Sequence, residues 1–302
     1  MRTSIRGSAL TERAPTSVPR AAIPANPWVR AARHFARQRV AVAGLAVLLL
    51  AIVTSGAAPW LSPHDPNLID VANPDAPPSF VHALGTDELG RDIVSRLLWG
   101  GRNTLLITLG AVAIAFVSGS ALGIAGGYYG GLSDTVIMRV MDVLLAIPGF
   151  LLAVAVIAAL GVGMTNVIIA IGVNSIPPFA RIARGATLLA REEVYVQAAQ
   201  ALGAGERTIM ARHIFPNILS PLVVQSTLRL ATAILTASGL SFLGLGVQPP
   251  TAEWGAMLSV GREYITSSPH LVIIPGMAIL VVTLAFNVVG DTVRDALDPR
   301  EL

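Results

Sequence analysis

Five long stretches with almost no charged side chain limit the fold of this sequence more than any other feature. Arg229 is the only charge within them. They cover residues 40–63, 103–133, 143–180, 214–252 and 271–290. A helix of about 20 apolar residues crosses a bilayer. The third stretch is too long for one crossing, and its Gly161–Asn166 segment predicts a hairpin turn. The sequence therefore predicts an all-α polytopic membrane protein with six transmembrane helices.

Composition supports this class and excludes several chemistries. The chain is 53% hydrophobic and only 13% charged, which does not suit a soluble globular protein. Its basic residues are 21 arginines without a lysine, so a phosphate-binding GxxxxGK[ST] loop and lysine catalysis are excluded. The lack of cysteine excludes disulfides, iron–sulfur clusters and thiolate metal sites. Nucleic-acid binding is not indicated either, because the arginines flank the apolar stretches.

Arginine positions predict the orientation. Sixteen arginines lie near span ends on one side of the predicted membrane and four on the other, which places both termini in the cytoplasm. A secretory signal peptide is not expected, because a long polar segment precedes the first apolar stretch. The expected parts are a disordered arm (1–25), an interfacial helix with the first span (26–60), an extracytoplasmic loop (61–103), a five-span core (104–290) and a tail (291–302). A plain extension of the first span is the alternative to the interfacial helix.

The cytoplasmic loop at about 181–217 is the most informative segment. Apolar residues from Val194 to Leu202 have helical spacing, Gly203 interrupts them, and a second helical pattern runs toward Pro216. This pattern predicts two short helices joined at a glycine. The pair either presents its small residues to another protein or packs only on its own chain.

Three further features of the sequence concern the start, packing and bending of the predicted spans. Thr86 is expected to cap an interfacial helix that leads into the second span, and a calcium site at Asp87, Glu88 and Asp92 is not favoured, because the EF-hand pattern is missing. A stripe of small residues in the second span predicts close helix packing, within the chain or against another. Prolines in the third and fourth spans are expected to bend them. These residues are Gly119, Gly123, Gly127, Pro148, Pro177 and Pro178.

Arg229 is predicted to face a translocation path or a subunit interface, with snorkelling along a kinked helix as the alternative. The histidines show no i, i+4 pair, and no stable metal site is expected. They are His34, His64, His82, His213 and His270. No arrangement of catalytic residues is evident, so the chain is not expected to be an enzyme.

The loop sequence QAAQALGAGERTIMARHIFPN resembles the EAA loop of ABC-importer permeases. Gln197 stands where that family usually has glutamate, and Phe215 where it has leucine. The resemblance implies coupling helices that dock on an ATP-hydrolysing subunit, which would hold the ATP and magnesium that this chain does not bind. The expected coupling residues are Glu193, Ala198, Ala199, Gly203, Ala204, Arg207 and Pro216.

Two predicted external segments, GTDELGRDIVSR and SGLSFLGLGVQPPTAEWGAML, resemble signatures of the C-type permease of dipeptide, oligopeptide and nickel importers. Ala237 replaces a glutamate found in many relatives. The resemblance implies a type I permease core in a bacterial or archaeal inner membrane. It also implies a second permease, ATP-binding subunits and a solute-binding protein. Di- or oligopeptides are the expected solute and nickel the alternative, while an ion-coupled secondary transporter would need intramembrane carboxylates.

Overall fold

The computed structural model describes residues 35–36 and 38–297. The predicted arm (1–25), the start of the expected interfacial helix and residues 298–302 of the predicted tail lie outside these residues. The described part consists of helices and loops with one isolated β-bridge. The helices are α2 (Arg39–Gly56), α3 (Ala58–Leu61), α4 (Ile93–Tyr129), α5 (Gly131–Ala146), α6 (Gly149–Leu160), α7 (Met164–Ala190), α8 (Val194–Ala201), α9 (Glu206–Thr208), the π-helix η1 (Ile209–Ile214), α10 (Phe215–Phe242), α11 (Trp254–Gly261), the 3-10 helix η2 (Arg262–Tyr264) and α12 (His270–Leu297).

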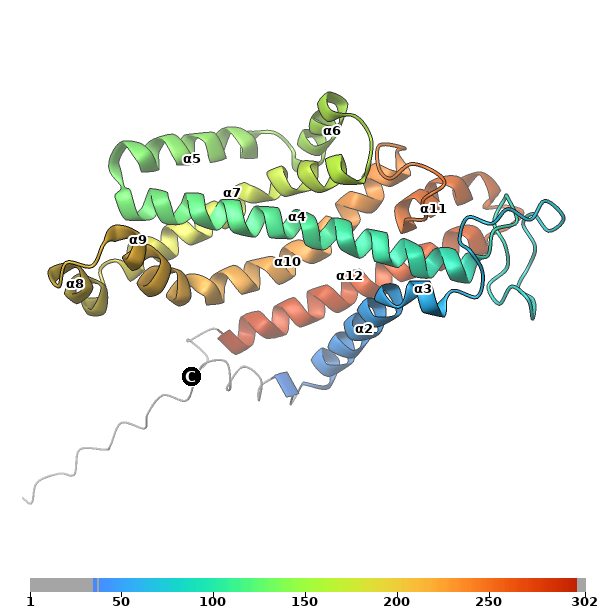
Figure 1. The fold of residues 1–302 in the computed structure, drawn as a ribbon, viewed down its shortest axis with the longest axis horizontal. Coiled ribbons are helices and arrows are strands. Elements are labelled where there is room, and N and C mark those ends of the chain that lie inside the picture. The colour runs from blue at the N-terminus through green and yellow to red at the C-terminus, as the bar shows by residue number, and fades with distance from the viewer. Residues whose placement is uncertain (1–34, 37, 298–302) are drawn as a thin grey trace, which may run out of the picture.

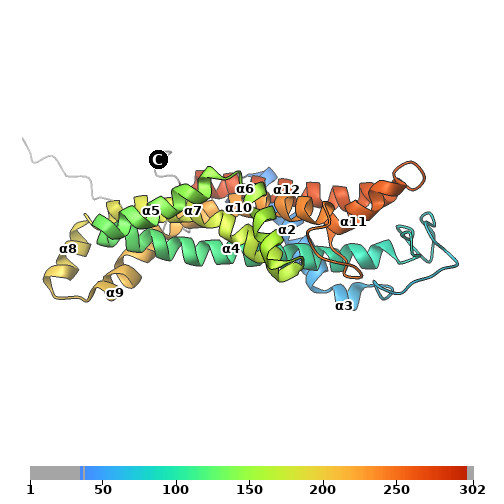
Figure 2. The same ribbon diagram turned by 90° about the horizontal axis from the view of Figure 1, so that it is seen from above.

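The long helices lie side by side along one axis of an elongated, flat molecule (Figures 1 and 2). The short helices α8 and α9 lie at one end of the molecule. The loop before α4 lies at the opposite end, with α11 toward that end (Figure 1). The two regions that carried the sequence motifs are therefore at opposite ends of the helical bundle.

Five helical segments are long and apolar enough to cross a membrane, and α5 and α6 form a sixth, bent unit. This confirms the all-helical fold with five or six apolar helices. The bend expected at Pro148 is confirmed and is sharp, because α5 and α6 meet at 95°. Pro148 lies at this break; proline lacks the backbone N–H that a continuing helix needs. By contrast, Pro177 and Pro178 lie inside α7 without ending it.

The N-terminal end of α4 differs from its prediction. Asp92, not Thr86, caps the helix, and its Oδ2 accepts a hydrogen bond from the Ser95 backbone N–H at 2.8 Å. Thr86 Oγ1 instead donates to the Asn73 carbonyl at 2.6 Å and accepts from the Ala76 N–H at 2.8 Å. The expected interfacial helix is therefore a folded loop followed directly by α4. With 37 residues, α4 is about 55 Å long, which exceeds the thickness of the hydrocarbon core.

The predicted glycine stripe packs within the chain. A Cβ at Gly123 would collide with the Ala180 carbonyl oxygen, and one at Gly119 would lie 2.6 Å from Phe179 Cβ. The stripe therefore brings α4 against α7, the most extensive helix pair of the described chain. One of two apolar cores contains this contact, and the half-buried Leu230 of α10 packs against both cores.

Candidate functional site

The loop between α7 and α10 starts with α8, whose first turn is closed by Gln197. The Glu193 side chain makes no capping hydrogen bond, although Glu193 is the N-cap residue. Gln197 Nε2 donates to the Glu192 carbonyl at 3.1 Å. The residue that replaces the usual family glutamate therefore holds the connection between α7 and α8. An amide makes this bond without a charge, whereas a carboxylate has no proton to donate.

The turn after α8 requires a glycine for its backbone conformation. Gly203 has φ +80°, a left-handed angle that other residues rarely adopt. Its N–H donates to the Gln200 carbonyl at 2.9 Å, and the Ala204 N–H donates to the Ala199 carbonyl at 3.0 Å. These bonds satisfy carbonyls at the end of α8. A Cβ at Gly203 would meet nothing within 4 Å, so the requirement is conformational and the space around it is open.

Three apolar side chains anchor this loop to the bundle. Val196 of α8 is fully buried, as are Ile209 and Ile214 of η1, and all three belong to the core that contains α4 and α7. The π-helix η1 continues into α10 without a break, and Pro216 is the second residue of α10. The loop is therefore joined firmly to the span that follows it.

Other apolar residues in and next to the same loop are exposed. Val194 is 80% exposed and Leu202 is 87% exposed, and Leu189 at the end of α7 is 76% exposed. Within α8, Val196 is the buried residue, so the helix turns Val196 inward and leaves Val194 outside. The three exposed side chains belong to α8, to the residue that follows it and to the end of α7, and α8 lies at one end of the molecule (Figure 1).

Charge pairs tie the helices together near this end. Asp134 of α5 accepts two hydrogen bonds from Arg184 of α7, and Arg181 Nη2 lies 2.6 Å from an oxygen of Asp142. Burial, followed by the nearby Glu193 carboxylate, raises the pKa of the Tyr195 phenol above its ordinary value. Tyr195 is therefore neutral at physiological pH and adds an uncharged, amphipathic side chain to the loop.

The structure brings the predicted coupling residues together at this one end. Ala199 and Ala204 are half-buried, and the others are exposed: Glu193, Ala198, Gly203, Arg207 and Pro216. Arg229 lies apart from them in α10. It is half-buried and makes no ion pair and no side-chain hydrogen bond with a residue that the structure describes. Ala237 is fully buried in the apolar core, where a glutamate would be costly.

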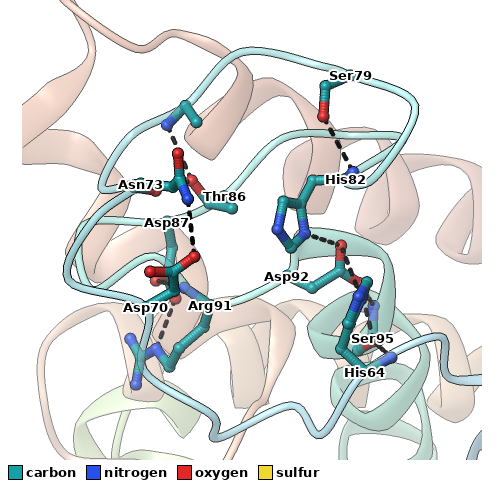
Figure 3. Close-up of polar contacts among 11 residues, drawn as sticks. His64, Asp70, Asn73, Ser79, His82, Thr86, Asp87, Arg91, Asp92 and Ser95 are labelled. Carbon is teal, nitrogen blue, oxygen red and sulfur yellow. Dashed lines mark hydrogen bonds and ion pairs between the residues drawn. The ribbon is translucent and has the colours of Figure 1, made fainter.

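The opposite end of the bundle, around the loop before α4, contains a second set of buried polar residues (Figure 3). Arg91 pairs with Asp87 and Glu88, each at 2.7 Å, and Arg96 lies 3.1 Å from Asp87. Burial, followed by the neighbouring Asp87 carboxylate, raises the pKa of Glu88. The disfavoured calcium site gains no support, since Asp87 and Glu88 are engaged by arginines.

The expectation of scattered histidines fails for His64 and His82, whose ring centroids are 4.9 Å apart.

Sequence reasoning also missed the role of Glu253. This carboxylate is fully buried and caps α11, accepting hydrogen bonds from the Gly255 and Ala256 N–H groups. It also accepts from Thr104 Oγ1 of α4 at 2.9 Å. Glu253 therefore fastens α11 to α4, and the pattern of a glutamate followed by a short apolar helix was the signal for it.

Comparison with known proteins identifies the family. Residues 119–302 match the binding-protein-dependent transport system inner membrane component, and residues 26–78 match the N-terminal TM domain of oligopeptide transport permease C. The chain belongs to this permease family. It is 46% identical over 275 residues to the glutathione transport system permease protein GsiD of Pectobacterium atrosepticum, with 91% of each chain covered. GsiD of Escherichia coli has the same identity and coverage.

The fold is also found in a solved structure. A chain of the MetNI methionine ABC transporter in an inward-facing conformation superposes with a TM-score of 0.53 at 20% identity, covering 68% of this chain and 97% of that one. This permease is therefore a multi-pass inner-membrane component of an ABC importer with the type I fold. Such a permease works with a solute-binding protein and with partner subunits that carry the ATPase activity.

Proposed function

We propose that this permease subunit imports short peptides, with the tripeptide glutathione as the first candidate. The supporting observation is the 46% identity, over 91% of both chains, to permeases named for glutathione transport. A second permease of the same family would complete the solute pathway, and a solute-binding protein would deliver the peptide to the end that holds the loop before α4.

The loop around Gly203 is proposed to receive the movement of an ATP-binding subunit. Val196, Ile209 and Ile214 already anchor it, so the exposed Val194 and Leu202 are not needed to hold it on its own chain. Exposed apolar side chains at one end of a molecule favour contact with a partner. This supports docking over the alternative of a hairpin that packs only on itself. ATP and magnesium would bind that partner, on the cytoplasmic side where both termini are expected.

Two other functions are weaker candidates. Nickel import remains within the same family, and the solute is chosen mainly by the binding protein. An ion-coupled secondary transporter is disfavoured for a physical reason: the α5 acids Asp134 and Asp142 are each paired with an arginine of α7. Carboxylates that arginines already engage are not free to bind a coupling ion.

The test is purification of the full chain from its native membrane in mild detergent, followed by an ATPase assay. Glutathione, other di- and tripeptides and Ni²⁺ are added separately, each with the binding protein encoded for the complex. We expect an ATP-binding subunit and a second permease to co-purify, and glutathione or other short peptides to stimulate hydrolysis. Stimulation by Ni²⁺ alone would contradict the peptide assignment. Uptake that is independent of ATP would contradict the coupling role.

A further inference from the structure

Two histidines and one aspartate meet at the external end of the bundle. His64 lies just after α3, His82 lies in the loop that follows, and Asp92 is the N-cap of α4. One ligand atom from each of the three lies within 4.8 Å of the others. Both imidazoles direct Nδ1 toward the same carboxylate oxygen: His82 Nδ1 lies 3.0 Å and His64 Nδ1 lies 3.9 Å from Asp92 Oδ1. Figure 3 shows this convergence.

We propose that His64, His82 and Asp92 bind a divalent late transition-metal ion, with Zn²⁺ as the representative. Two imidazole nitrogens and one carboxylate oxygen are a ligand set that such ions prefer, whereas Ca²⁺ and Mg²⁺ prefer oxygen alone. Ligand atoms at about 2.1 Å from one ion are roughly 3.0 to 3.5 Å apart. The two measured separations bracket this range, so small side-chain shifts complete the geometry. Water supplies the remaining position, since the His64 side chain is 33% exposed.

The charge of Asp92 and the hydrogen bonding of His64 are both compatible with a bound cation. The neighbouring arginines, Arg91 and Arg96, pair with Asp87 and Glu88 and not with Asp92. Asp92 is buried, and its ion-pair partners among the residues that the structure describes are the two histidines. His64 Nδ1 is buried without a hydrogen-bond partner in the described chain. A bound ion would satisfy this nitrogen and neutralise the carboxylate.

Ser95 positions two of the three ligands. Its backbone N–H and its hydroxyl each donate to Asp92 Oδ2 at 2.8 Å, which turns Oδ1 toward the histidines. The same hydroxyl accepts a hydrogen bond from the His64 backbone N–H at 3.1 Å. Partners that orient ligands in this way commonly contribute about 10- to 100-fold to metal affinity. A metal ion here would join two points of the loop, His64 and His82, to the N-cap of α4.

The experiment is a Zn²⁺ titration by calorimetry on the full-length permease in its purified complex, carrying an affinity tag without histidine. We expect saturable binding of one Zn²⁺ per chain. His64→Asn and His82→Asn should each weaken it at least tenfold, and Ser95→Ala should weaken it about tenfold. Asparagine at 82 keeps a side-chain donor for Asp92, which preserves the local fold. His213→Gln, at the opposite end of the bundle, should bind Zn²⁺ as the wild type does.

Two further readouts separate a metal site from a hydrogen-bonded cluster. Co²⁺ in place of Zn²⁺ should give visible d–d absorption in the wild type that both asparagine variants lose. Zn²⁺ should raise the thermal midpoint of the wild type alone, while the metal-free midpoints of the variants stay close to it. The proposal would be overturned by the absence of saturable Zn²⁺ binding, or by equal affinity in the wild type and both asparagine variants. Either result would leave His82 and Asp92 as hydrogen-bond partners only.

Discussion

At the scale of single residues, backbone conformation and close approach decide which positions are sensitive. Gly203 has open space around it and a left-handed backbone conformation. Glycine is therefore required there for its φ angle and not for lack of space. Gly90 has φ +75°, and a Cβ there would overlap the Asp70 carbonyl oxygen. Both glycines were visible in the sequence as parts of motifs. Only the structure shows that one is constrained by conformation and the other also by contact.

Gly203→Trp should leave the protein inserted in the membrane and reduce ATP-driven uptake by more than tenfold. Tryptophan at a left-handed angle costs about 1 to 2 kcal/mol locally, and its bulk would stand among the exposed docking residues. Gly205→Ala is the matched control, because Gly205 has φ −66° and an added Cβ would meet nothing within 4 Å. Uptake and membrane insertion are measured in proteoliposomes and by fractionation. Normal uptake by Gly203→Trp would refute the role given to this turn.

Asp70 makes the stability of the folded loop before α4 depend on pH. Its carboxylate accepts hydrogen bonds from Asn73 Nδ2 at 2.8 Å and from the Ala72 N–H at 3.0 Å, and these bonds, chiefly the first, lower its pKa. A lowered pKa stabilises the folded loop above the ordinary value of about 4. That stabilisation is lost as the pH falls through the folded-state value. The protection factor of the Ala72 amide, which is its exchange rate corrected for the intrinsic effect of pH, should therefore fall on acidification, and Asp70→Asn should abolish this fall. An unchanged profile in Asp70→Asn would contradict the assignment.

At the scale of helices, hydropathy predicted the spans well and their breaks poorly. The apolar stretches indicated the elements, because a span must satisfy its backbone internally and cover itself with apolar side chains. A bend at Pro148 was predicted, but its sharpness and the continuity of α7 past Pro177 and Pro178 were not, since a proline in a span can either break a helix or lie within it. The decision depends on packing, and Gly149 has Asn174 Oδ1 only 2.6 Å from where a Cβ would be.

In the coupling loop, too, the sequence predicted the helix and the turn but not which side chains are buried. The motif located α8 and the turn at Gly203, because glycine has a local conformational signature. It did not show that Val196 turns inward while Val194 and Leu202 stay exposed, since that depends on contacts with η1. His64 and His82 could not be paired from the sequence for a similar reason. Their approach depends on how the intervening loop folds around Thr86 and Asp92.

Gly123→Ala tests the helix contact of α4 with α7. A Cβ there would collide with the Ala180 carbonyl oxygen, a backbone atom that cannot rotate away. Overpacking of this kind costs about 1 to 3 kcal/mol, so the thermal midpoint should fall and the yield of assembled complex should drop. Gly56→Ala in α2 is the control, since nothing lies within 4 Å of its Cβ position. A midpoint equal to that of the Gly56→Ala control would contradict the packing.

At the scale of the whole molecule, one continuous element connects the two functional ends. α10 starts at the π-helix of the loop around Gly203 and ends at Phe242, whose carbonyl accepts a hydrogen bond from Ser259 of α11 at 2.8 Å. Its 28 residues span about 42 Å. Glu253 in turn fastens α11 to α4. A displacement of the loop around Gly203 can therefore be transmitted through α10 and α11 to the opposite end of the molecule, as alternating access requires.

The most direct measurement is photo-crosslinking from position 202 in the native membrane. Leu202 is 87% exposed beside the turn, and replacing it with a benzophenone amino acid places the probe on the proposed docking surface. The same probe at Leu284, 53% exposed on α12, is the control. The account predicts that position 202 captures the ATP-binding subunit, identified by mass spectrometry, and that position 284 does not. Capture of no ATP-binding subunit at 202, or equal capture at both positions, would contradict it.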